Sequence, residues 1–317
     1  MKIIVTHTSP DMDAITSVWL IRRFLPGWED AQTQFVPAGE RIGNLKSQIS
    51  NLKSPIETVG EDEVIHVDTG LGPLDHHQTA SDKVCAASLT WEYVKYQISK
   101  IKDQKVNKEK QRDREKAVSR MVKVVVDTDH FKEVFWANPT ADYYEFSVGA
   151  ILDGLKLQKP NQDEYYVSFV SECLDSILHE FENRIWAEKE IAENGQKFET
   201  RFGKGIGFET INDSVIKLAQ KIGYVIVVRK DPRKGYVRVK ARPSREVSKE
   251  TKVSKVPKGE KEIDLTLAYE KLRKMDPNAT WFLHIGKKML LNGSVKNPKM
   301  RPTRLGLGEI IKVLEKI

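Results

Sequence analysis

Residues 5–17 read VTHTSPDMDAITS and place His7, Asp11 and Asp13 where an opening apolar run, KIIVTH, gives way to a helical pattern. Two carboxylates this close together repel each other unless a positive charge lies between them. Taken alone, the stretch also fits an Asp that caps the start of a helix. The choice between a cation site and a helix cap therefore depends on which other side chains the fold brings to this turn.

Length and composition bound the class of protein. The 317 residues suffice for two domains, and 39% hydrophobic with 31% charged residues is typical of a folded globular chain. No apolar run has the length of a membrane span, and the N-terminus lacks a signal-peptide pattern. Cys85 and Cys173 are too few and too isolated for a disulfide framework or a zinc knuckle. We expect a cytoplasmic protein with no membrane partner.

The charge is distributed unevenly along the chain. Residues 1–200 carry 24 Lys and Arg against 33 Asp and Glu, a net charge of −9, and residues 201–317 carry 28 against 12, a net charge of +16. An acidic half joined to a basic half predicts cations bound in the first and a polyanion bound by the second. A solvated, Lys-rich surface without a partner is the alternative interpretation of the basic half.

Short apolar runs alternate with helical patterns in the first two thirds of the chain. KIIVTH, TQFVPAG and EVIHVDTG read as strands, and residues 17–25, 86–101 and 165–194 as helices. This alternation predicts an α/β domain with a mostly parallel sheet over 1–200. A hairpin around PRKG, helices at 265–275 and 305–317, and a strand TWFLHIG predict a smaller α+β domain over 201–317. The boundary is expected between about 195 and 212, and residues 243–262 read as a basic loop.

Polar residues with ligand chemistry follow four of the apolar runs. In an open parallel sheet, functional groups gather at the carboxyl ends of the strands. We expected Asp127 to end a strand, VKVVVD, in the same way as Asp68 ends VIHVD. The candidates are His7, Asp11, Asp13, Asp68, Asp75, His76, His77 and Asp127.

The ligand types indicate which ion such a pocket would hold. Carboxylates with imidazoles suit Mn²⁺ or Mg²⁺, and the absence of paired Cys disfavours a structural zinc site. Four aspartates and two or three histidines exceed the needs of one ion. They fit two ions about 3.5–4 Å apart that share a carboxylate, an arrangement that activates water for in-line attack on phosphorus. Each motif alone also fits a cap, a polar loop or a strand end, and the metal interpretation depends on their occurrence together.

At these residues the sequence resembles the DHH phosphoesterase superfamily. THTSPDMDAI is similar to its first motif, VDTG to the second, LDHHQT to the third and VVVDTDHF to the fourth. The resemblance covers roughly residues 1–190 and implies a two-metal phosphoesterase fold. Members include RecJ-type exonucleases, oligoribonucleases, cyclic-dinucleotide phosphodiesterases and family II inorganic pyrophosphatases.

The resemblance also implies roles for individual residues. His7 and Asp11 would bind one metal ion, Asp13, His76 and Asp127 the second, and Asp68 would bridge them. His77 would face the scissile phosphate, and Asp75 would orient a neighbouring His. The supporting groups would be His66, Asp129 and His130.

The C-terminal half lacks the Gly-Gly-Gly-His stretch of RecJ-type members. Its ending, WFLHIGKKMLLNGSVKNPKMRPTRLGLGEII, instead resembles the melanocyte-proliferating-gene family of DHH-like nucleases, whose first motif differs from the one in this chain. Basic side chains and exposed backbone N–H groups suit phosphate oxygens. The candidate substrate-binding residues are His284, Lys287, Lys288, Asn292, Gly293, Ser294, Lys296, Arg301 and Arg304.

A second basic set lies in the predicted hairpin over 229–242. Seven Lys and Arg side chains there fit a phosphodiester chain better than a single pyrophosphate, although a solvated hairpin is the alternative. Tyr224, Tyr236 and Trp281 could stack on bases, but core packing is the expected use of each.

The function expected from all of this is hydrolysis of phosphodiester bonds in single-stranded RNA or DNA or in short oligonucleotides. Mn²⁺ is the expected metal, with Mg²⁺ second. Two alternatives stay open: an inorganic pyrophosphatase or cyclic-dinucleotide phosphodiesterase, and a non-catalytic nucleic-acid-binding protein with a structural metal site. A homodimer also stays open.

Overall fold

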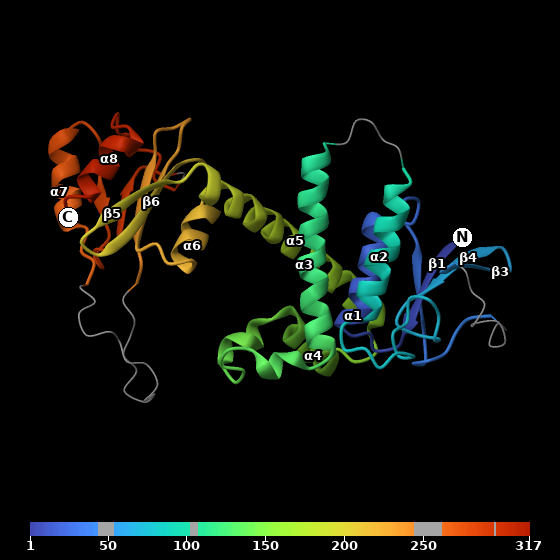
Figure 1. Cartoon of the computed structure of the whole chain (residues 1–317). Helices are drawn as coiled ribbons and strands as arrows, with labels where there is room; N and C mark the ends of the chain where they lie inside the picture. The colour runs from blue at the N-terminus through green and yellow to red at the C-terminus, as the bar shows by residue number, and fades with distance from the viewer. Residues whose placement is uncertain (44–53, 102–106, 244–261, 295) are drawn as a thin grey trace. The chain divides into compact units, whose positions relative to one another are not determined.

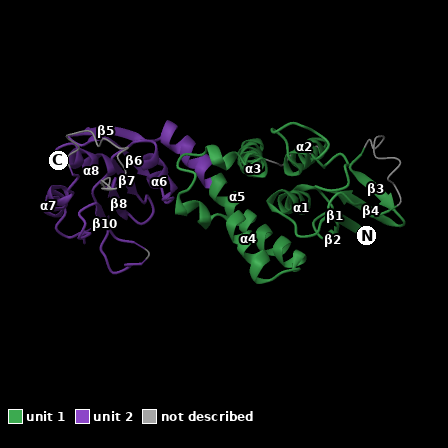
Figure 2. Cartoon of the chain, turned by 90° about the horizontal axis from the view of Figure 1, so that it is seen from below, with its two compact units in different colours: residues 1–182 green, residues 183–317 purple. Residues whose placement is uncertain are grey.

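The structure is a computed structural model of the chain and describes residues 1–43, 54–101, 107–243, 262–294 and 296–317 (Figure 1). It divides into two units, Met1–Glu182 and Asn183–Ile317 (Figure 2). The boundary falls inside a long helix and not near residue 200 as predicted, because Ala187 and Ile191 of that helix are buried in the core of the second unit. The basic loop expected over 243–262 lies almost entirely outside the described residues.

The first unit alternates strands and helices as the sequence predicted. Its elements are β1 (Lys2–His7), α1 (Met12–Phe24), β2 (Gln32–Val36), β3 (Ile56–Val59), β4 (Asp62–His66), α2 (Ala86–Ser99), α3 (Lys108–Asp129), the 3-10 helices η2 (Lys132–Phe135) and η3 (Asp142–Phe146), α4 (Val148–Gln158) and most of α5 (Asp163–Glu193).

The sheet of the first unit has the strand order β2-β1-β4-β3. Strand β1 pairs in parallel with β2 and with β4, whereas β3 is antiparallel to β4, so the sheet is mostly parallel. His7 pairs with Val36, and Val5 with His66. The carboxyl ends of β1, β2 and β4 therefore lie at one edge of the sheet.

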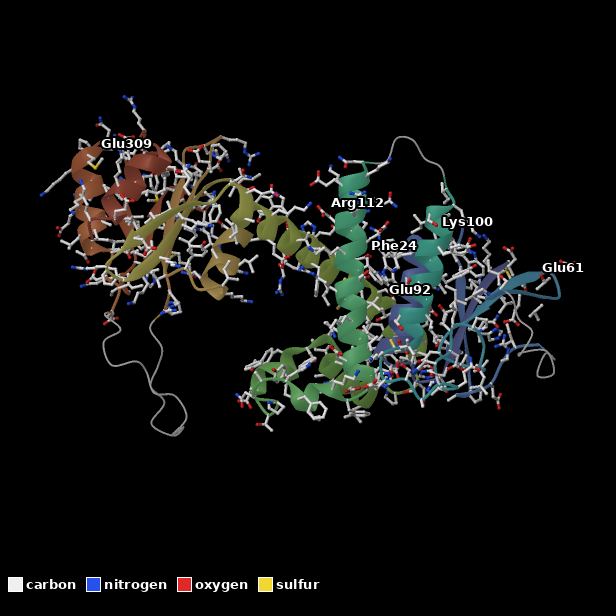
Figure 3. All side chains as sticks on the ribbon, viewed as in Figure 1. Phe24, Glu61, Glu92, Lys100, Arg112 and Glu309 are labelled. Carbon is white, nitrogen blue, oxygen red and sulfur yellow. The ribbon has the colours of Figure 1, made fainter. Side chains whose placement is uncertain are left out.

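Apolar side chains on both faces hold this sheet. Ile3 and Val5 form a cluster with Val64 on one face, while the alternate residues Ile4 and Ile65 are fully buried on the other. Helix α1 packs on β1, and α2 and α3 pack on α1 (Figure 1). Phe24, labelled in Figure 3, has its ring 5.4 Å from that of Trp19 in α1 and 5.6 Å from that of Trp91 in α2.

The predicted strand VKVVVD is wrong, because these residues form the last turns of α3. Asn107 caps this helix by accepting hydrogen bonds from the N–H groups of Glu109 and Lys110. The buried residues recur at steps of one and three, which is the period of a helix face; they are Ala117, Val118, Met121, Val122, Val125 and Val126. The helical period therefore prevails over the β-propensity of the three consecutive valines.

The second unit contains a six-stranded mixed sheet with the order β5-β6-β7-β8-β10-β9. Only β6 and β7 are parallel, and every other pair is antiparallel. Its elements are β5 (Gln196–Thr200), β6 (Gly203–Glu209), α6 (Ser214–Lys221), β7 (Ile226–Lys230), β8 (Val237–Ala241), α7 (Thr266–Met275), β9 (Phe282–Leu283), β10 (Met289–Asn292) and α8 (Leu307–Leu314).

Helices cover the two faces of this sheet unequally. On one face α7 and α8 pack on side chains from strands across the sheet, from Phe198 in β5 to Leu290 in β10. On the other face α6 and the end of α5 pack on β6 and β7, with Phe208 and Val227 at the centre. The predicted hairpin over β7 and β8 and the predicted helices at α7 and α8 are confirmed.

Among the helices of the described ranges, none is both long and apolar enough to cross a membrane.

Asp264 and Lys287 join the start of α7 to the turn between β9 and β10. The Asp264 carboxylate accepts a hydrogen bond from Thr266 N at 2.8 Å and lies 2.9 Å from Lys287 Nζ. Partial burial alone would raise the pKa of Asp264, but hydrogen bonds from Thr266 and Lys287 lower it to about 2. The ionised form of Asp264 is therefore the one that the fold prefers.

We expect the Asp264–Lys287 pair to stabilise the second unit above about pH 4 and to lose its effect as the pH falls toward 2, because the unfolded carboxyl has the higher pKa. Asp264→Asn keeps an acceptor for Thr266 N but removes the charge. Urea unfolding should show a deficit for Asp264→Asn near neutral pH that shrinks on acidification. A deficit that is constant with pH would contradict this account.

Candidate metal centre

The carboxyl ends of β1 and β4 bring His7 and Asp68 together. His7 Nε2 lies 3.3 Å from Asp68 Oδ2, and His7 Nδ1 lies 2.9 Å from the carbonyl oxygen of Thr8. Since a carbonyl only accepts, Nδ1 carries a proton and Nε2 faces the carboxylate. Asp68 is 3% exposed and has a left-handed backbone, with φ 53°.

Asp11 is both a helix cap and a candidate metal ligand, the two interpretations that the opening stretch allowed. Its Oδ1 atom accepts hydrogen bonds from Asp13 N at 2.9 Å and Ala14 N at 3.0 Å, so Asp11 caps α1. A carboxylate oxygen of Asp11 also lies within 4.8 Å of ligand atoms of His7 and Asp68. Capping α1 thus orients Asp11 toward the neighbouring strand ends.

Asp13 is buried and connects α1 to the start of α2. Its two carboxylate oxygens accept hydrogen bonds from Ala86 N and Ala87 N, both at 2.7 Å. A carboxylate at a helix N-terminus is stabilised by the unpaired N–H groups and by the helix dipole. Its Oδ2 atom also lies 3.7 Å from His76 Nε2, so Asp13 lies at the edge of the cluster.

The LDHH motif holds its second histidine in a fixed orientation. Asp75 Oδ2 accepts a hydrogen bond from Leu71 N at 2.7 Å, and Oδ1 accepts bonds from His77 N at 3.0 Å and from His77 Nδ1 at 2.7 Å. The His77 side chain is 59% exposed, whereas that of Asp75 is 1% exposed. His76 lies deeper, with Nε2 3.6 Å from Asp68 Oδ1.

The end of α3 brings Asp129, and not Asp127, to this cluster. Asp127 forms a salt bridge with Lys123 of the same helix at 3.1 Å and belongs to none of the candidate ligand groups found among the described residues. Asp129 Oδ2 lies 3.7 Å from His76 Nε2. His130, whose Nε2 donates to Val84 O at 2.8 Å, completes a group with them. Both had been assigned only supporting roles from the sequence.

Three groups of potential ligands overlap at this edge of the sheet, and in each the ligand atoms lie within 4.8 Å of one another. Asp68 belongs to two groups and His76 to two. The groups are His7–Asp11–Asp68, Asp68–His76–His77 and His76–Asp129–His130.

Two buried oxygens in the cluster test whether these residues fit a metal ion. Asp68 Oδ1 and Asp129 Oδ2 are shielded from solvent and have no hydrogen-bond partner among the described residues. A buried carboxylate oxygen without a partner is costly unless a cation or proton satisfies it. Carboxylate and imidazole donors match the preferences of Mn²⁺ and Mg²⁺. The donor set and the unpartnered oxygens therefore fit a divalent cation.

The electrostatics of the cluster also favour added positive charge. Burial raises the pKa of Asp13 well above its usual range, and the charge of Asp68 raises it further. Burial likewise raises the pKa of Asp129. Burial alone would lower the pKa of His7, but its hydrogen bonds to Asp68 and Thr8 and the charge of Asp11 raise it to about 9. The pKa shifts of the two carboxyl groups are due first to burial and then to neighbouring carboxylates, whose negative charge also favours the protonated form of His7.

A buried ionic network underlies the loop that carries Asp68, and two of its members, Arg41 and Glu57, were not predicted from the sequence. The Arg41, Glu57 and His66 side chains are 2%, 3% and 1% exposed. Arg41 Nη2 donates to Glu57 Oε1, and Nη1 donates to the carbonyl oxygen of Gly70 at 3.0 Å. His66 Nε2 accepts a hydrogen bond from Ile42 N at 3.2 Å, so its Nδ1 carries the proton and faces Glu57.

The loop above Arg41 has an unusual backbone. Asp68, Gly70 and Leu71 all have positive φ, at 53°, 74° and 57°. A Cβ atom on Gly70 would lie 2.3 Å from Arg41 Cγ, so the guanidinium stem packs directly on the loop. Non-glycine residues with positive φ persist where surrounding contacts impose that conformation. We infer that Arg41 positions Asp68 through Gly70.

In the second unit, several predicted substrate-binding residues have structural partners. Asn292 is fully buried, donates to the carbonyl oxygens of Thr280 and Arg301, and accepts from Thr303 N. Lys288 donates to Ile263 O at 2.7 Å. Lys287 pairs with Asp264, as described above.

The remaining predicted residues lie in turns or at the surface. His284 Nδ1 accepts a hydrogen bond from Gly286 N, and Ser294 bridges to Asn297. Gly293 is buried with φ 79°, and a Cβ there would lie 2.3 Å from the Tyr236 ring. The exposed members of the set are His284, Lys287, Lys296, Arg301 and Arg304. Of these, Lys287 is paired with Asp264, whereas Lys296, Arg301 and Arg304 follow β10.

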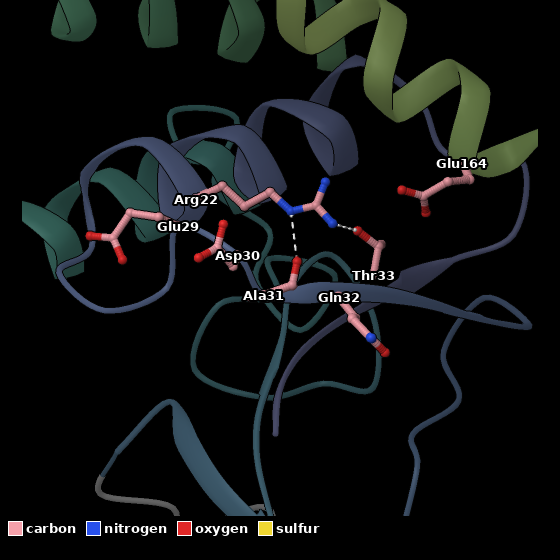
Figure 4. A pocket seen from close by; sticks show the side chains of 7 residues that line it. All are labelled: Arg22, Glu29, Asp30, Ala31, Gln32, Thr33 and Glu164. Atoms are coloured by element: carbon pink, nitrogen blue, oxygen red, sulfur yellow. Dashed lines mark hydrogen bonds between the residues drawn. The ribbon is translucent and has the colours of Figure 1, made fainter.

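A polar cavity of about 500 Å³ lies away from the cluster (Figure 4). Arg22 spans it and donates to Ala31 O at 2.9 Å and to Thr33 Oγ1 at 2.7 Å. Gln32 begins β2, whereas the cluster lies at the carboxyl end of the same sheet. The cavity contains none of the predicted site residues.

Compared with known proteins, the chain matches no family model and no curated protein. Among solved structures, it is similar to an uncharacterized protein from Helicobacter pylori G27 with a TM-score of 0.27 and 11% sequence identity, over 100% of this chain and 99% of that one.

We expect Arg41→Met to lower the free energy of unfolding by about 3–5 kcal/mol, because it leaves the buried carboxylate of Glu57 without its positively charged partner and with only the His66 N–H. Adding Glu57→Gln should restore part of the loss. Arg23→Met is the control, since its pair with Asp175 is about half exposed and worth about 0–1 kcal/mol. Urea unfolding measures all four proteins, and similar losses for Arg41→Met and Arg23→Met would refute the assignment.

We expect Asp129→Asn to weaken Mn²⁺ binding by about tenfold or more, and Asp127→Asn to leave it nearly unchanged. The two carboxylates lie two residues apart on α3, but only Asp129 faces the cluster. Isothermal titration of the metal-free protein with Mn²⁺ measures both variants. If Asp127→Asn weakens Mn²⁺ binding and Asp129→Asn does not, Asp127 is the ligand instead.

Proposed function

We propose that the chain is a metal-dependent phosphoesterase of the DHH type that hydrolyses phosphodiester bonds in single-stranded nucleic acid or short oligonucleotides. The observation that carries the proposal is that two buried oxygens, Asp68 Oδ1 and Asp129 Oδ2, have no hydrogen-bond partner among the described residues and lie within overlapping groups of His and Asp ligands. The four DHH-like motifs in the sequence supply the residues of these groups, with Asp129 in place of Asp127.

The overlap of the groups supports a two-ion site. Asp68 shares one group with His7 and Asp11 and another with His76 and His77, as a bridging carboxylate would. Two bound divalent ions would stabilise negative charge on the attacking and leaving oxygens of a phosphoryl group. His7 and Asp11 would hold one ion and His76 and Asp129 the other, while Asp13 buttresses α2 beside them.

His77 is the residue best suited to act on the substrate. Asp75 holds its Nδ1 atom at 2.7 Å, so the exposed ring presents Nε2 outward. Burial alone would lower the pKa of His77, but the hydrogen bond to Asp75 raises it. A histidine that holds its proton can donate from Nε2 to a phosphate oxygen or to the leaving group.

The charge of the second unit supports a polymeric substrate. Residues 183–317 carry 31 Lys and Arg against 16 Asp and Glu, a net charge of +15. A pyrophosphate needs only a few cationic groups, whereas a phosphodiester chain offers one negative charge per nucleotide.

We expect Mn²⁺-loaded protein to release mononucleotides from a short RNA or a single-stranded DNA. His77→Ala should lower the rate by about 100-fold or more. The control His179→Ala, an exposed residue of α5, should not. Phosphate release from pyrophosphate alone, or cleavage of cyclic di-AMP alone, would replace the proposal with the corresponding small-substrate activity. Binding without turnover of any substrate would identify a nucleic-acid-binding protein with a structural metal site.

A further inference from the structure

On one half of the six-stranded sheet, the second face is not covered by a helix among the residues that the structure describes. The buried cluster on that face takes its strand residues from β6 and β7 and its helix residues from α5 and α6. Among the described residues, none from β8, β10 or β9 belongs to it. These three strands therefore present a partly exposed face, called the open face below and defined by the exposed Phe282 and the half-buried Arg238, Lys240, Met289 and Leu291.

Strand register determines which residues share this open face. Val227 lies in the α6-covered cluster and pairs with Lys240, which pairs with Met289. The next row runs from Arg238 through Leu291 to Phe282. Paired residues in an antiparallel sheet point to the same side, and the alternate residues, such as Val239 and Leu290, are buried on the opposite face against α7 and α8.

The open face is apolar and aromatic in part. Phe282 is 48% exposed although it lies in a strand between the buried Trp281 and the half-buried Leu283. Tyr236, two residues before Arg238, lies with its ring over Gly293, where a Cβ would come within 2.3 Å of it. Two aromatic rings thus border the face at β9 and at the start of β8. Exposed rings on a sheet are a common platform for stacked bases.

The charge of the open face is positive. The segments that form β8, β9 and β10 contain Arg238 and Lys240 and no acidic residue. Arg238 shares Asp213 with Arg229, so one carboxylate faces two guanidinium groups there. A positively charged face attracts a polyanion. It disfavours contact with the same face of a second copy of the chain, which would carry the same charge.

We propose that the open face of β8, β10 and β9 binds single-stranded nucleic acid, with the exposed Phe282 and the edge of the half-buried Tyr236 stacking on bases and Lys240 contacting phosphates. The inference rests on the proposed function, because a nuclease that acts on a chain needs a surface for nucleotides beyond the scissile one. The inference adds a surface made of strand residues to the exposed side chains that follow β10, namely Lys296, Arg301 and Arg304.

The test is fluorescence anisotropy of a labelled oligothymidylate with the full chain in EDTA, where no hydrolysis occurs. Phe282→Leu keeps an apolar side chain but removes the ring, and it should weaken binding by about fivefold or more. Phe282→Trp should bind like the wild type. Met275→Leu is the matched control, since Met275 of α7 is also 48% exposed.

Lys240→Gln tests the phosphate contact separately. It should lower the slope of log Kd against log salt by about 0.7, the value for one phosphate on a single strand. Lys312→Gln, an exposed lysine on α8, should leave the slope unchanged.

Three results would overturn the proposal: no binding by the wild type, equal binding by Phe282→Leu and Met275→Leu, or a change in oligomeric state on Phe282→Leu with unchanged affinity. The last result would assign the face to a second copy of the chain. Binding that depends on Phe282, with no hydrolysis when Mn²⁺ is restored, would support the surface and reject the proposed function. If the oligonucleotide is hydrolysed and neither its binding nor its hydrolysis changes in Phe282→Leu, the proposed function is supported and the binding surface is rejected.

Discussion

The candidate site depends on one buried carboxylate, Asp68, whose negative charge must be compensated. It lies two residues after the end of β4, is almost completely shielded from water, and has one oxygen without a hydrogen-bond partner among the described residues. Burying an ionised group without a partner is costly, so the surroundings must supply positive charge. His7 provides some of it through a raised pKa, and the overlapping groups of ligands around Asp68 offer positions for more. The rest of the first unit can be understood as support for this residue.

That support comes from two directions, and both use backbone hydrogen bonds. In the first, Arg41 donates a hydrogen bond to the carbonyl oxygen of Gly70 and is itself paired with Glu57. In the second, Asp13 accepts hydrogen bonds from the first N–H groups of α2 and so keeps that helix next to the cluster. Neither residue needs to touch a substrate in order to matter for the site, because Arg41 holds the loop that follows Asp68 and Asp13 holds the start of α2.

The sequence predicted those parts of the fold that depend on local pattern. The strands β1 and β4 were found from short apolar runs, and α5 from apolar residues at steps of three and four. The strand predicted to end at Asp127 was wrong, because three consecutive valines resemble a strand although the residues before them already follow a helical period. Arg41 and Glu57 could not be found, since their pairing joins positions distant in sequence and carries no motif. The sequence likewise could not predict which strands of the second sheet α6 covers, because that depends on contacts between segments distant in sequence.

The position of Asp129 beside His76, at the end of α3, makes the length of this helix a constraint on the cluster. Successive residues of an α-helix are rotated by about 100° about its axis. Asp127 and Asp129 are two residues apart, so their side chains point to nearly opposite sides of α3. Trp91 of α2 fixes the rotation of α3 further back, by donating to Ser119 Oγ at 2.9 Å. Inserting or deleting a single residue between Ser119 and the helix end would therefore turn the terminal carboxylate away from its histidines. The chain can tolerate substitutions on the outer surface of this helix more readily than any change in its residue count.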